Sequence, residues 1–320
     1  MKKILTLFAG YDKYNIIDEY VIYYIKELKK ISDIIYASNC YFDDKELKKI
    51  SDYCITTICT PHGEYDFGSY KRAYLYAKEQ HLFEKYDYIL ICNDSCYGPF
   101  CDLNNIIDKM LKHDFSGVYM TTHKMMANND NIALFFTTIS KNIFLSDYFD
   151  NFMCSIKKEN DKFDIIRKYE IGLSKLILDH NIELYSIYLG ASNIETLYSD
   201  PLFLIKNGFP FLKKGTLEGK YEKVPISDFK SIMQIIKNNY DINLIVNHLN
   251  RVSNKEQINY LFYVGGTSNK NLISDKILSI TNQYSVSGKH QTIYKIFNSI
   301  KITINHKEVI PNNFNFLLGK

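Results

Sequence analysis

Three short polar residues, Asn93, Asp94 and Ser95, directly follow the apolar run "YDYILIC" at 86–92. Such a run is suited to a buried strand, and open α/β sheets bind ligands at the carboxyl ends of their strands. Hard divalent cations prefer oxygen ligands, so one carboxylate between an amide and a hydroxyl could hold a cation and a phosphate. The same residue types are common helix and turn caps, and taken alone the tripeptide favours the capping role.

A second candidate is the stretch "HGEYDFGSYKRAY" at 62–74. Gly63 and Gly68 bracket an acidic, aromatic turn, and Lys71 and Arg72 follow on an expected helix. Glycine permits close approach of the backbone, and a helix N-terminus with two cations suits a phosphate. The alternative is an ordinary strand-to-helix loop with a solvated Lys-Arg pair.

Glu170 lies at the border of an apolar helical stripe in "KYEIGLSKLI" at 168–177. A carboxylate placed there could reach a cleft and take a proton from a hydroxyl, as a general base does. The alternative is a surface ion pair with Arg167, three residues earlier, and the residues alone favour it.

The remaining candidates have weaker signals. His62 and His123 fall near expected strand or loop ends, where most histidines are surface residues. The stretch "NGFPFLKKG" at 207–215, which contains Phe209 and Lys213, is either a rigid aromatic turn beside a groove or core packing. The sequence contains no Walker loop, no GxSxG elbow and no CxxC pairing.

The elements that must position these residues alternate between strand and helix over the first 120 residues. Such alternation predicts an α/β fold, with a mostly parallel sheet and helices on both faces. Expected strands lie at 3–9, 33–38, 54–59, 86–92, 115–120, 131–139 and 182–188. One expected helix begins near residue 17. The others lie at about 68–80, 140–153, 162–180 and 227–251. A boundary is expected near 252, so that residues 252–320 form a C-terminal extension.

Composition narrows the partners and the compartment. The net charge of +3 is too small to suggest nucleic acid, although a slightly basic protein could rest against an anionic membrane surface. Seven cysteines, without a second close pair, predict buried thiols in a reducing compartment rather than a zinc site. The N-terminal apolar run is short for a signal peptide, and no stretch reaches the length of a membrane span. A cytoplasmic protein is expected, with contact at the inner face of the membrane as an extension of that expectation.

The motifs, taken in order, resemble those of the rhamnan synthesis protein F family, bacterial glycosyltransferases of polysaccharide and lipopolysaccharide assembly. The resemblance covers about residues 3–251, and its most specific marks are "YDFG" and "NDSxYGP". It implies a GT-A-like fold with a Rossmann-type nucleotide-binding sheet and a helical C-terminal extension. It also implies transfer, with inversion, of L-rhamnose or another deoxyhexose from a dTDP-sugar to a hydroxyl of a glycan or lipid-linked glycan.

The resemblance also implies roles for individual residues. Asp94 stands where GT-A enzymes keep a metal-binding DxD, which makes it the candidate ligand for Mn or Mg, and Glu170 stands where inverting enzymes place the catalytic base. Donor or nucleotide contacts are implied for Tyr11, Asp12, Asp66, Gly68, Lys71, Asn93, Asp94 and Ser95. On the acceptor side we expect His123, Phe209 and Lys213.

The sequence departs from the family pattern at three places. Gly10 stands where a histidine is common, Gly63 and Glu64 replace Asn and Gly, and "IALFF" replaces a Gln-Ser-Tyr-Phe-like stretch. These departures leave open another donor, or a catalytically impaired glycosyltransferase-like subunit that docks a partner in an assembly complex. A phosphatase of the haloacid-dehalogenase type would need Asp-x-Asp after the first strand, and the sequence offers only Asp12 there.

Overall fold

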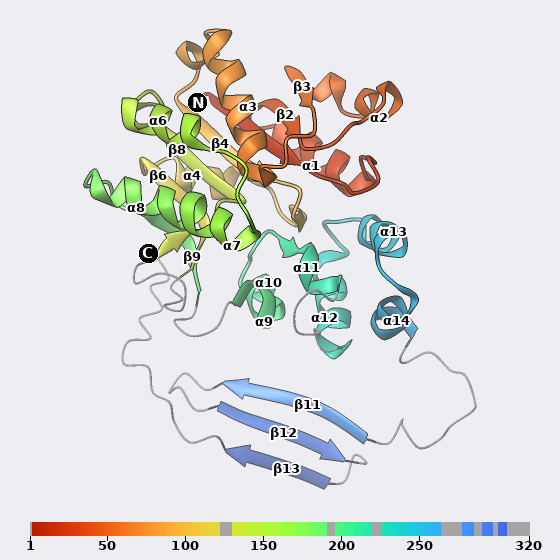
Figure 1. Cartoon of the computed structure of the whole chain (residues 1–320). Coiled ribbons are helices and arrows are strands. Elements are labelled where there is room, and N and C mark those ends of the chain that lie inside the picture. The colour runs from red at the N-terminus through yellow and green to blue at the C-terminus, as the bar shows by residue number, and fades with distance from the viewer. Residues whose placement is uncertain are drawn as a thin grey trace. The chain divides into compact units, whose positions relative to one another are not determined.

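The computed structural model describes residues 2–121, 130–190, 196–218, 226–263, 277–284, 290–296 and 300–305. The chain divides into two compact units, Met1–Leu261 and Phe262–Lys320 (Figure 1). Within the described ranges, no helix combines the length and the apolar character that a bilayer crossing requires.

The first unit is built on an eight-stranded sheet with the strand order β3-β2-β1-β4-β8-β6-β7, and β9 pairs with β6. Its strands are β1 Ile4–Gly10, β2 Asp33–Ser38, β3 Thr56–Cys59, β4 Tyr88–Asn93, β6 Phe115–Thr121, β7 Asn131–Ile132, β8 Phe136–Ser140 and β9 Tyr185–Leu189. The pairs β1–β2, β1–β4, β2–β3 and β6–β9 are parallel, whereas β4–β8, β6–β7 and β6–β8 are antiparallel. The expected α/β fold with a mostly parallel sheet is therefore confirmed.

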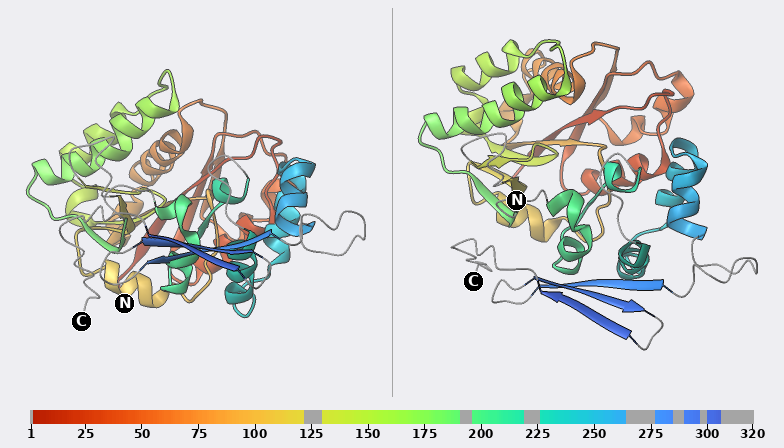
Figure 2. Two further views of the ribbon diagram at one scale, coloured as in Figure 1. Left: turned by 90° about the horizontal axis from the view of Figure 1, so that it is seen from below. Right: turned by 60° about the horizontal axis from the view of Figure 1, so that its bottom comes forward.

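Helices cover both faces of this sheet, so the strand β1 is buried along its whole length (Figure 2). Leu5 and Leu7 face a core shared with α3 and α8, and Phe8 faces the other way and packs edge-on against Tyr24 of α1. The longer helices of this unit are α1 Glu19–Lys29, α3 Tyr65–Glu79, α4 Asn104–Met110, α6 Asp147–Ser155, α8 Gly172–Asp179, α12 Ile226–Ile236 and α13 Asn243–Val252. The shorter ones are α2 Asp44–Lys48, α5 Lys141–Phe144, α7 Lys162–Ile165, α9 Thr196–Ser199, α10 Pro201–Lys206, α11 Lys214–Leu217 and α14 Lys255–Ile258.

The helix α3 begins at Tyr65, earlier than the expected start near Gly68. Its buried residues Phe67, Tyr70, Tyr74 and Ala77 recur at helical spacing and face the sheet, which fixes the orientation of the helix. The "YDFG" motif is consequently the first turn of α3 and not the loop before it.

The expected strand at 131–139 is two strands. A turn at Ala133–Phe135 separates β7 from β8, and the Phe135 N–H donates to the Ala133 carbonyl at 2.9 Å. The expected helix at 162–180 is instead a continuous run of α7, a π-helical segment Ile166–Ile171, and α8.

In the described residues of the expected helical C-terminal extension, helix is found as far as Tyr263. Beyond it, β11 Ile277–Tyr284, β12 His290–Ile296 and β13 Ile300–Asn305 form an antiparallel three-stranded sheet. The reason is visible in "IKITIN" at 300–305, where isoleucine alternates with polar residues at the period of a strand.

Gly10, the residue at the end of β1 that departs from the family pattern, has a packing explanation. A Cβ atom there would lie 2.0 Å from the hydroxyl oxygen of Tyr36 on β2. We expect Gly10→Ala to lower the free energy of unfolding by about 1–3 kcal/mol, because the crowded core must shift. The matched control is Gly172→Ala, where the nearest atom lies 3.6 Å away. Urea denaturation measures both, and equal stabilities for the two variants would contradict the packing explanation.

Candidate functional site

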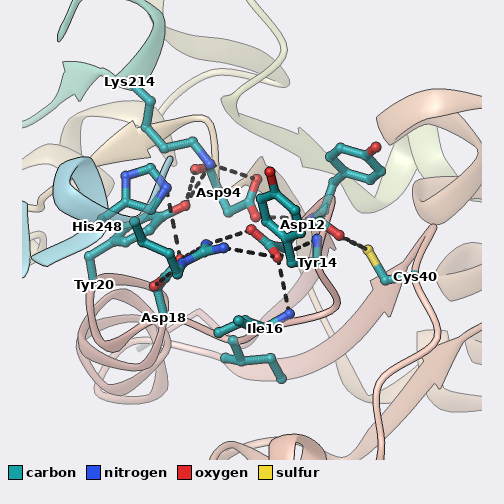
Figure 3. Close-up of polar contacts among 12 residues, drawn as sticks. Asp12, Tyr14, Ile16, Asp18, Tyr20, Cys40, Asp94, Lys214 and His248 are labelled. Atoms are coloured by element: carbon teal, nitrogen blue, oxygen red, sulfur yellow. Dashed lines mark hydrogen bonds and ion pairs between the residues drawn. The ribbon is translucent and has the colours of Figure 1, made fainter. Parts of the chain in front are cut away.

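Asp94 links the carboxyl ends of the parallel neighbours β1 and β4. Its carboxylate Oδ2 accepts a hydrogen bond from the Tyr11 N–H at 3.0 Å, and Oδ1 lies 3.7 Å from the Lys214 ammonium (Figure 3). The Asp94 side chain is buried, and burial raises its pKa, against the effect of Lys214 and of the Tyr11 N–H. Asp94 therefore holds the loop after β1 and carries a charge that one lysine partly balances.

Asn93 joins the "NDS" and "YDFG" motifs. Its Nδ2 donates to Asp66 Oδ2 at 2.9 Å, and its Oδ1 accepts from the N–H and the hydroxyl of Ser95 at 3.2 and 2.5 Å. Asp66 lies in the first turn of α3, where the positive end of the helix favours an anion. Four residues expected at the donor site, Asp66, Asn93, Asp94 and Ser95, therefore meet at the strand ends, with the backbone of Tyr11 beside them.

Two lysines reach the same cluster from a distant part of the chain. The two-residue strand β10 Leu212–Lys213 pairs antiparallel with β5 Cys96–Tyr97, which directly follows Ser95. Lys213 donates to Ser95 Oγ at 2.9 Å, and the Lys214 N–H donates to the Ser95 carbonyl at 2.9 Å. The Lys214 ammonium also donates to the Tyr20 hydroxyl at 2.5 Å (Figure 3). Lys213 was expected on the acceptor side, but it lies beside Ser95, one of the residues expected to contact the donor. Lys214 was not among the residues predicted from the sequence.

Arg251 of α13 binds the loop after β1. Its guanidinium donates to Asp12 at 2.5 and 3.3 Å and to both oxygens of Asp18. Burial alone would lower the pKa of Arg251, but the hydrogen bonds to Asp18 and Asp12 outweigh it and raise that pKa. His248, one turn earlier on α13, places Nε2 3.8 Å from Asp18 and Nδ1 2.6 Å from the Tyr97 hydroxyl (Figure 3).

Asp12 was expected near the base or ribose of a nucleotide, but its side chain is committed within the protein. In addition to Arg251, its Oδ1 accepts from the N–H groups of Tyr14 and Ile16 at 2.8 and 3.1 Å. The rings of Tyr11 and Tyr14 are 50% and 58% exposed, so in this loop the aromatic side chains, and not the carboxylate, face solvent.

Gly68 does not offer an open approach to its backbone. A Cβ atom there would lie 2.5 Å from the Nδ1 of His62 and from the Cβ of Glu64. His62 Nδ1 accepts from the Glu64 N–H at 3.1 Å, and burial lowers the pKa of His62 to about 4, so the imidazole is neutral. Gly68 is therefore required for packing inside the turn.

Lys71 and Phe209 are also placed elsewhere. The Lys71 ammonium donates to the carbonyls of Cys154 and Ile156 at 3.1 and 2.7 Å, so it caps the end of α6 rather than a phosphate. Phe209 is 3% exposed and packs against the rings of Tyr119, Phe135, Tyr188 and Phe211, which is core packing and not an acceptor groove. The expected acceptor residue His123 lies outside the described residues.

Glu170 lies half-buried in the π-helical segment Ile166–Ile171. Segments of this kind are frequent at functional sites. Burial raises the pKa of Tyr70, and the charges of Asp66 and Glu170 add to that rise. Glu170 is therefore within electrostatic reach of Tyr70, as Asp66 is.

The residues at the strand ends do not fit a divalent cation. Across the ranges that the structure describes, no three His, Cys, Asp or Glu side chains are grouped as metal ligands. One Asp94 oxygen accepts a backbone N–H and the other faces the Lys214 ammonium, so neither is presented to a cation. The assignment of Asp94 as a metal ligand therefore has no support in this geometry.

The raised pKa of Asp66 predicts how the free energy of unfolding depends on pH. Burial raises it from 3.8 to about 6, and Asp94 adds to the rise against Lys213 and Lys214. Because the folded protein holds this proton more tightly than the unfolded chain, the free energy of unfolding falls as pH rises from about 4 to 6. We expect Asp66→Asn to be more stable than wild type at pH 8 by on the order of 1–2 kcal/mol, an advantage lost near pH 4.

Urea denaturation at pH 4, 6 and 8 measures this difference, with the exposed Asp108→Asn as the matched control. If the difference in free energy of unfolding between Asp66→Asn and wild type were the same at all three pH values, the raised pKa of Asp66 would be contradicted.

Comparison with known proteins places the chain in a family. The fold is similar to solved structures of a nucleotide-diphospho-sugar transferase from Desulfovibrio desulfuricans, at 12% identity with a TM-score of 0.36, covering 78% of this chain and 99% of that one. It is also similar to core-mannan synthase A from Aspergillus fumigatus in its Mn/GDP form, at 10% identity with a TM-score of 0.34, covering 54% and 70%. No curated protein matches the sequence. The model of rhamnan synthesis protein F matches residues 34–299, most of the chain, and the protein therefore belongs to the rhamnan synthesis protein F family.

Proposed function

We propose that the protein is a glycosyltransferase that moves a sugar from a nucleoside diphosphate to a hydroxyl group. Besides the family match, one structural observation supports the proposal. At the carboxyl ends of β1 and β4, the structure brings together five side chains: Asp66, Asn93, Ser95, Lys213 and Lys214. Ligands bind at this edge in open α/β sheets, and ammonium groups there suit a diphosphate.

The donor that we propose is a dTDP-sugar of the deoxyhexose class, with L-rhamnose first, because the family is named for rhamnan synthesis. The acceptor is the hydroxyl of a polysaccharide or lipopolysaccharide precursor, free or lipid-linked. We place the reaction in the cytoplasm, at the inner face of the membrane when the acceptor is lipid-linked.

The proposed chemistry is a single displacement with inversion. Glu170 takes the proton of the acceptor hydroxyl, and the acceptor oxygen forms the new bond to C1 of the sugar. The bond between C1 and the phosphate oxygen breaks, and its electron pair leaves with the nucleoside diphosphate. A base on one face of the sugar and anion-stabilising groups on the other are what this displacement needs.

Binding and transfer are tested separately. Purified protein is titrated with dTDP, UDP and GDP by calorimetry, with and without manganese, and then incubated with the matching sugar nucleotides and a glycan acceptor. We expect one nucleotide to bind with a micromolar or tighter dissociation constant, and NMR of the product to show an inverted anomeric centre. Failure of all three nucleotides to bind would overturn the proposal. Nucleotide binding without transfer to any acceptor would favour the impaired, partner-docking subunit.

A further inference from the structure

Lys213 is a buried cation that forms no ion pair among the described residues, although its charge acts on Asp66 and opposes the rise in the pKa of that carboxyl. Its residue is 8% exposed, and its ammonium donates to the neutral Ser95 hydroxyl at 2.9 Å and lies 3.6 Å from the centre of the Phe135 ring. In the part of the chain that the structure describes, no carboxylate lies within ion-pair distance of this ammonium. An ammonium has three donors, and burying one without a close counter-charge is costly, so an anion would be a favourable further partner for Lys213.

Lys214 adds a second positive charge next to the first. It lies between the Tyr20 hydroxyl, at 2.5 Å, and Asp94 Oδ1, at 3.7 Å, and its side chain is 15% exposed. The longer contact to Asp94 only partly balances its charge. Lys213 is bound to the Ser95 hydroxyl by its ammonium, and Lys214 to the Ser95 carbonyl by its backbone N–H. The charges of both lysines act on Asp66, so two ammonium groups contribute to the electrostatics of the end of β4.

Resting on the proposed function, we propose that Lys213 and Lys214 bind the donor diphosphate directly and do the work of a divalent cation, so that transfer is metal-independent. Phosphate oxygens supply Lys213 with a counter-charge at ion-pair distance, which Asp66 does not provide. As the bond between C1 and the phosphate oxygen breaks, the two ammonium groups stabilise the charge that develops on the nucleoside diphosphate.

The contacts of the two neighbouring carboxyl groups, Asp94 and Asp66, are consistent with lysines, and not a metal ion, binding the diphosphate. One oxygen of Asp94 accepts a hydrogen bond from the Tyr11 N–H, and the other faces the Lys214 ammonium. Asp94 therefore positions both the loop after β1 and this lysine. Asp66 is bound by Asn93 and has its pKa raised to about 6 by burial and by Asp94. Phosphate binding next to Asp66 would favour its protonated form further, which limits repulsion between the two anions.

The test uses inorganic pyrophosphate as the probe for the diphosphate alone, beside dTDP, UDP and GDP. Dissociation constants are measured by calorimetry in EDTA and in manganese for wild type, Lys213→Met, Lys214→Met and Lys112→Met. Lys112 is exposed and distant in the fold, so Lys112→Met removes the same charge as a matched control. We expect wild type and Lys112→Met to bind equally in EDTA and manganese, and each site variant to bind pyrophosphate at least tenfold more weakly.

Thermal melting separates a binding role from a structural one. Ligand-free Lys213→Met should melt at or above the wild-type temperature, because it removes a buried charge that forms no ion pair among the described residues. Pyrophosphate should raise the melting temperature of wild type but not of this variant. Wild-type binding that disappears in EDTA, or unchanged affinity in both site variants, would overturn the inference and leave the proposed function standing. Binding of pyrophosphate without any nucleotide would instead overturn the proposed function and keep the anion site.

Discussion

Replacing Glu170 with glutamine should reduce the transfer rate by about 10²- to 10⁴-fold and leave nucleotide affinity unchanged. The expected size is that of a lost general base, because glutamine preserves the shape of the side chain but cannot accept the acceptor's proton. Glu170 lies in the π-helical segment, apart from the lysines that we assign to the diphosphate, so binding and catalysis should separate. Steady-state kinetics and calorimetry on the same preparation measure the two quantities.

The control for this variant is Asp164→Asn, on the same helical run. Asp164 forms an ion pair with the exposed Arg167 at 2.8 Å, the type of contact that the sequence alone had favoured for Glu170. We expect full activity for Asp164→Asn, and a pH dependence of the rate in wild type that Glu170→Gln lacks. A Glu170→Gln enzyme with wild-type rates would remove this residue from the mechanism and leave the enzyme class untouched.

Replacing Arg251 with methionine should lower the free energy of unfolding by about 3 kcal/mol. Arg251 is the shared partner of Asp12 and Asp18, whose side chains are only 13% and 16% exposed. Without the guanidinium, two poorly solvated carboxylates repel each other in the loop after β1. Urea denaturation measures the loss.

The loss of stability should be recovered in part when the carboxylates are also removed. In the triple variant Arg251→Met, Asp12→Asn, Asp18→Asn the amide groups need no counter-charge, so its stability should exceed that of Arg251→Met alone. Equal stability of wild type and Arg251→Met would show that these ion pairs contribute nothing to the fold. We also expect weaker nucleotide binding in Arg251→Met, because the same loop carries the Tyr11 N–H that holds Asp94.

The sequence predicted the parts of the site that follow from local pattern. Buried strands of apolar residues and helices with periodic stripes located the carboxyl ends of β1 and β4, and hence Asp94 and its neighbours. The contact between Asp66 and Asn93 agrees with the packing of α3 on β1, the strand that pairs with β4. The prediction of the strands succeeded because the period of an apolar pattern determines which face of an element is buried.

The contacts that individual lysine and arginine side chains make could not be predicted from the sequence. Lys71 looked like a phosphate ligand, but it caps α6 because its side chain points away from the strand ends. Lys214 and Arg251 reach the site through a two-residue strand pair and through the end of α13, and neither produces a periodic signal. Lysine and arginine have long, flexible side chains, so residue type and spacing do not fix what their charged groups contact.

The short ribbon of β5 and β10 has a mechanical consequence. Because Lys213 and Lys214 are adjacent on one segment, and both are tied to Ser95, the ribbon carries them as a single unit. A small separation of β10 from β5 would withdraw two positive charges from the strand ends in one motion, while the large sheet stays intact. The register of these two short strands therefore determines where both lysine backbones lie relative to Ser95.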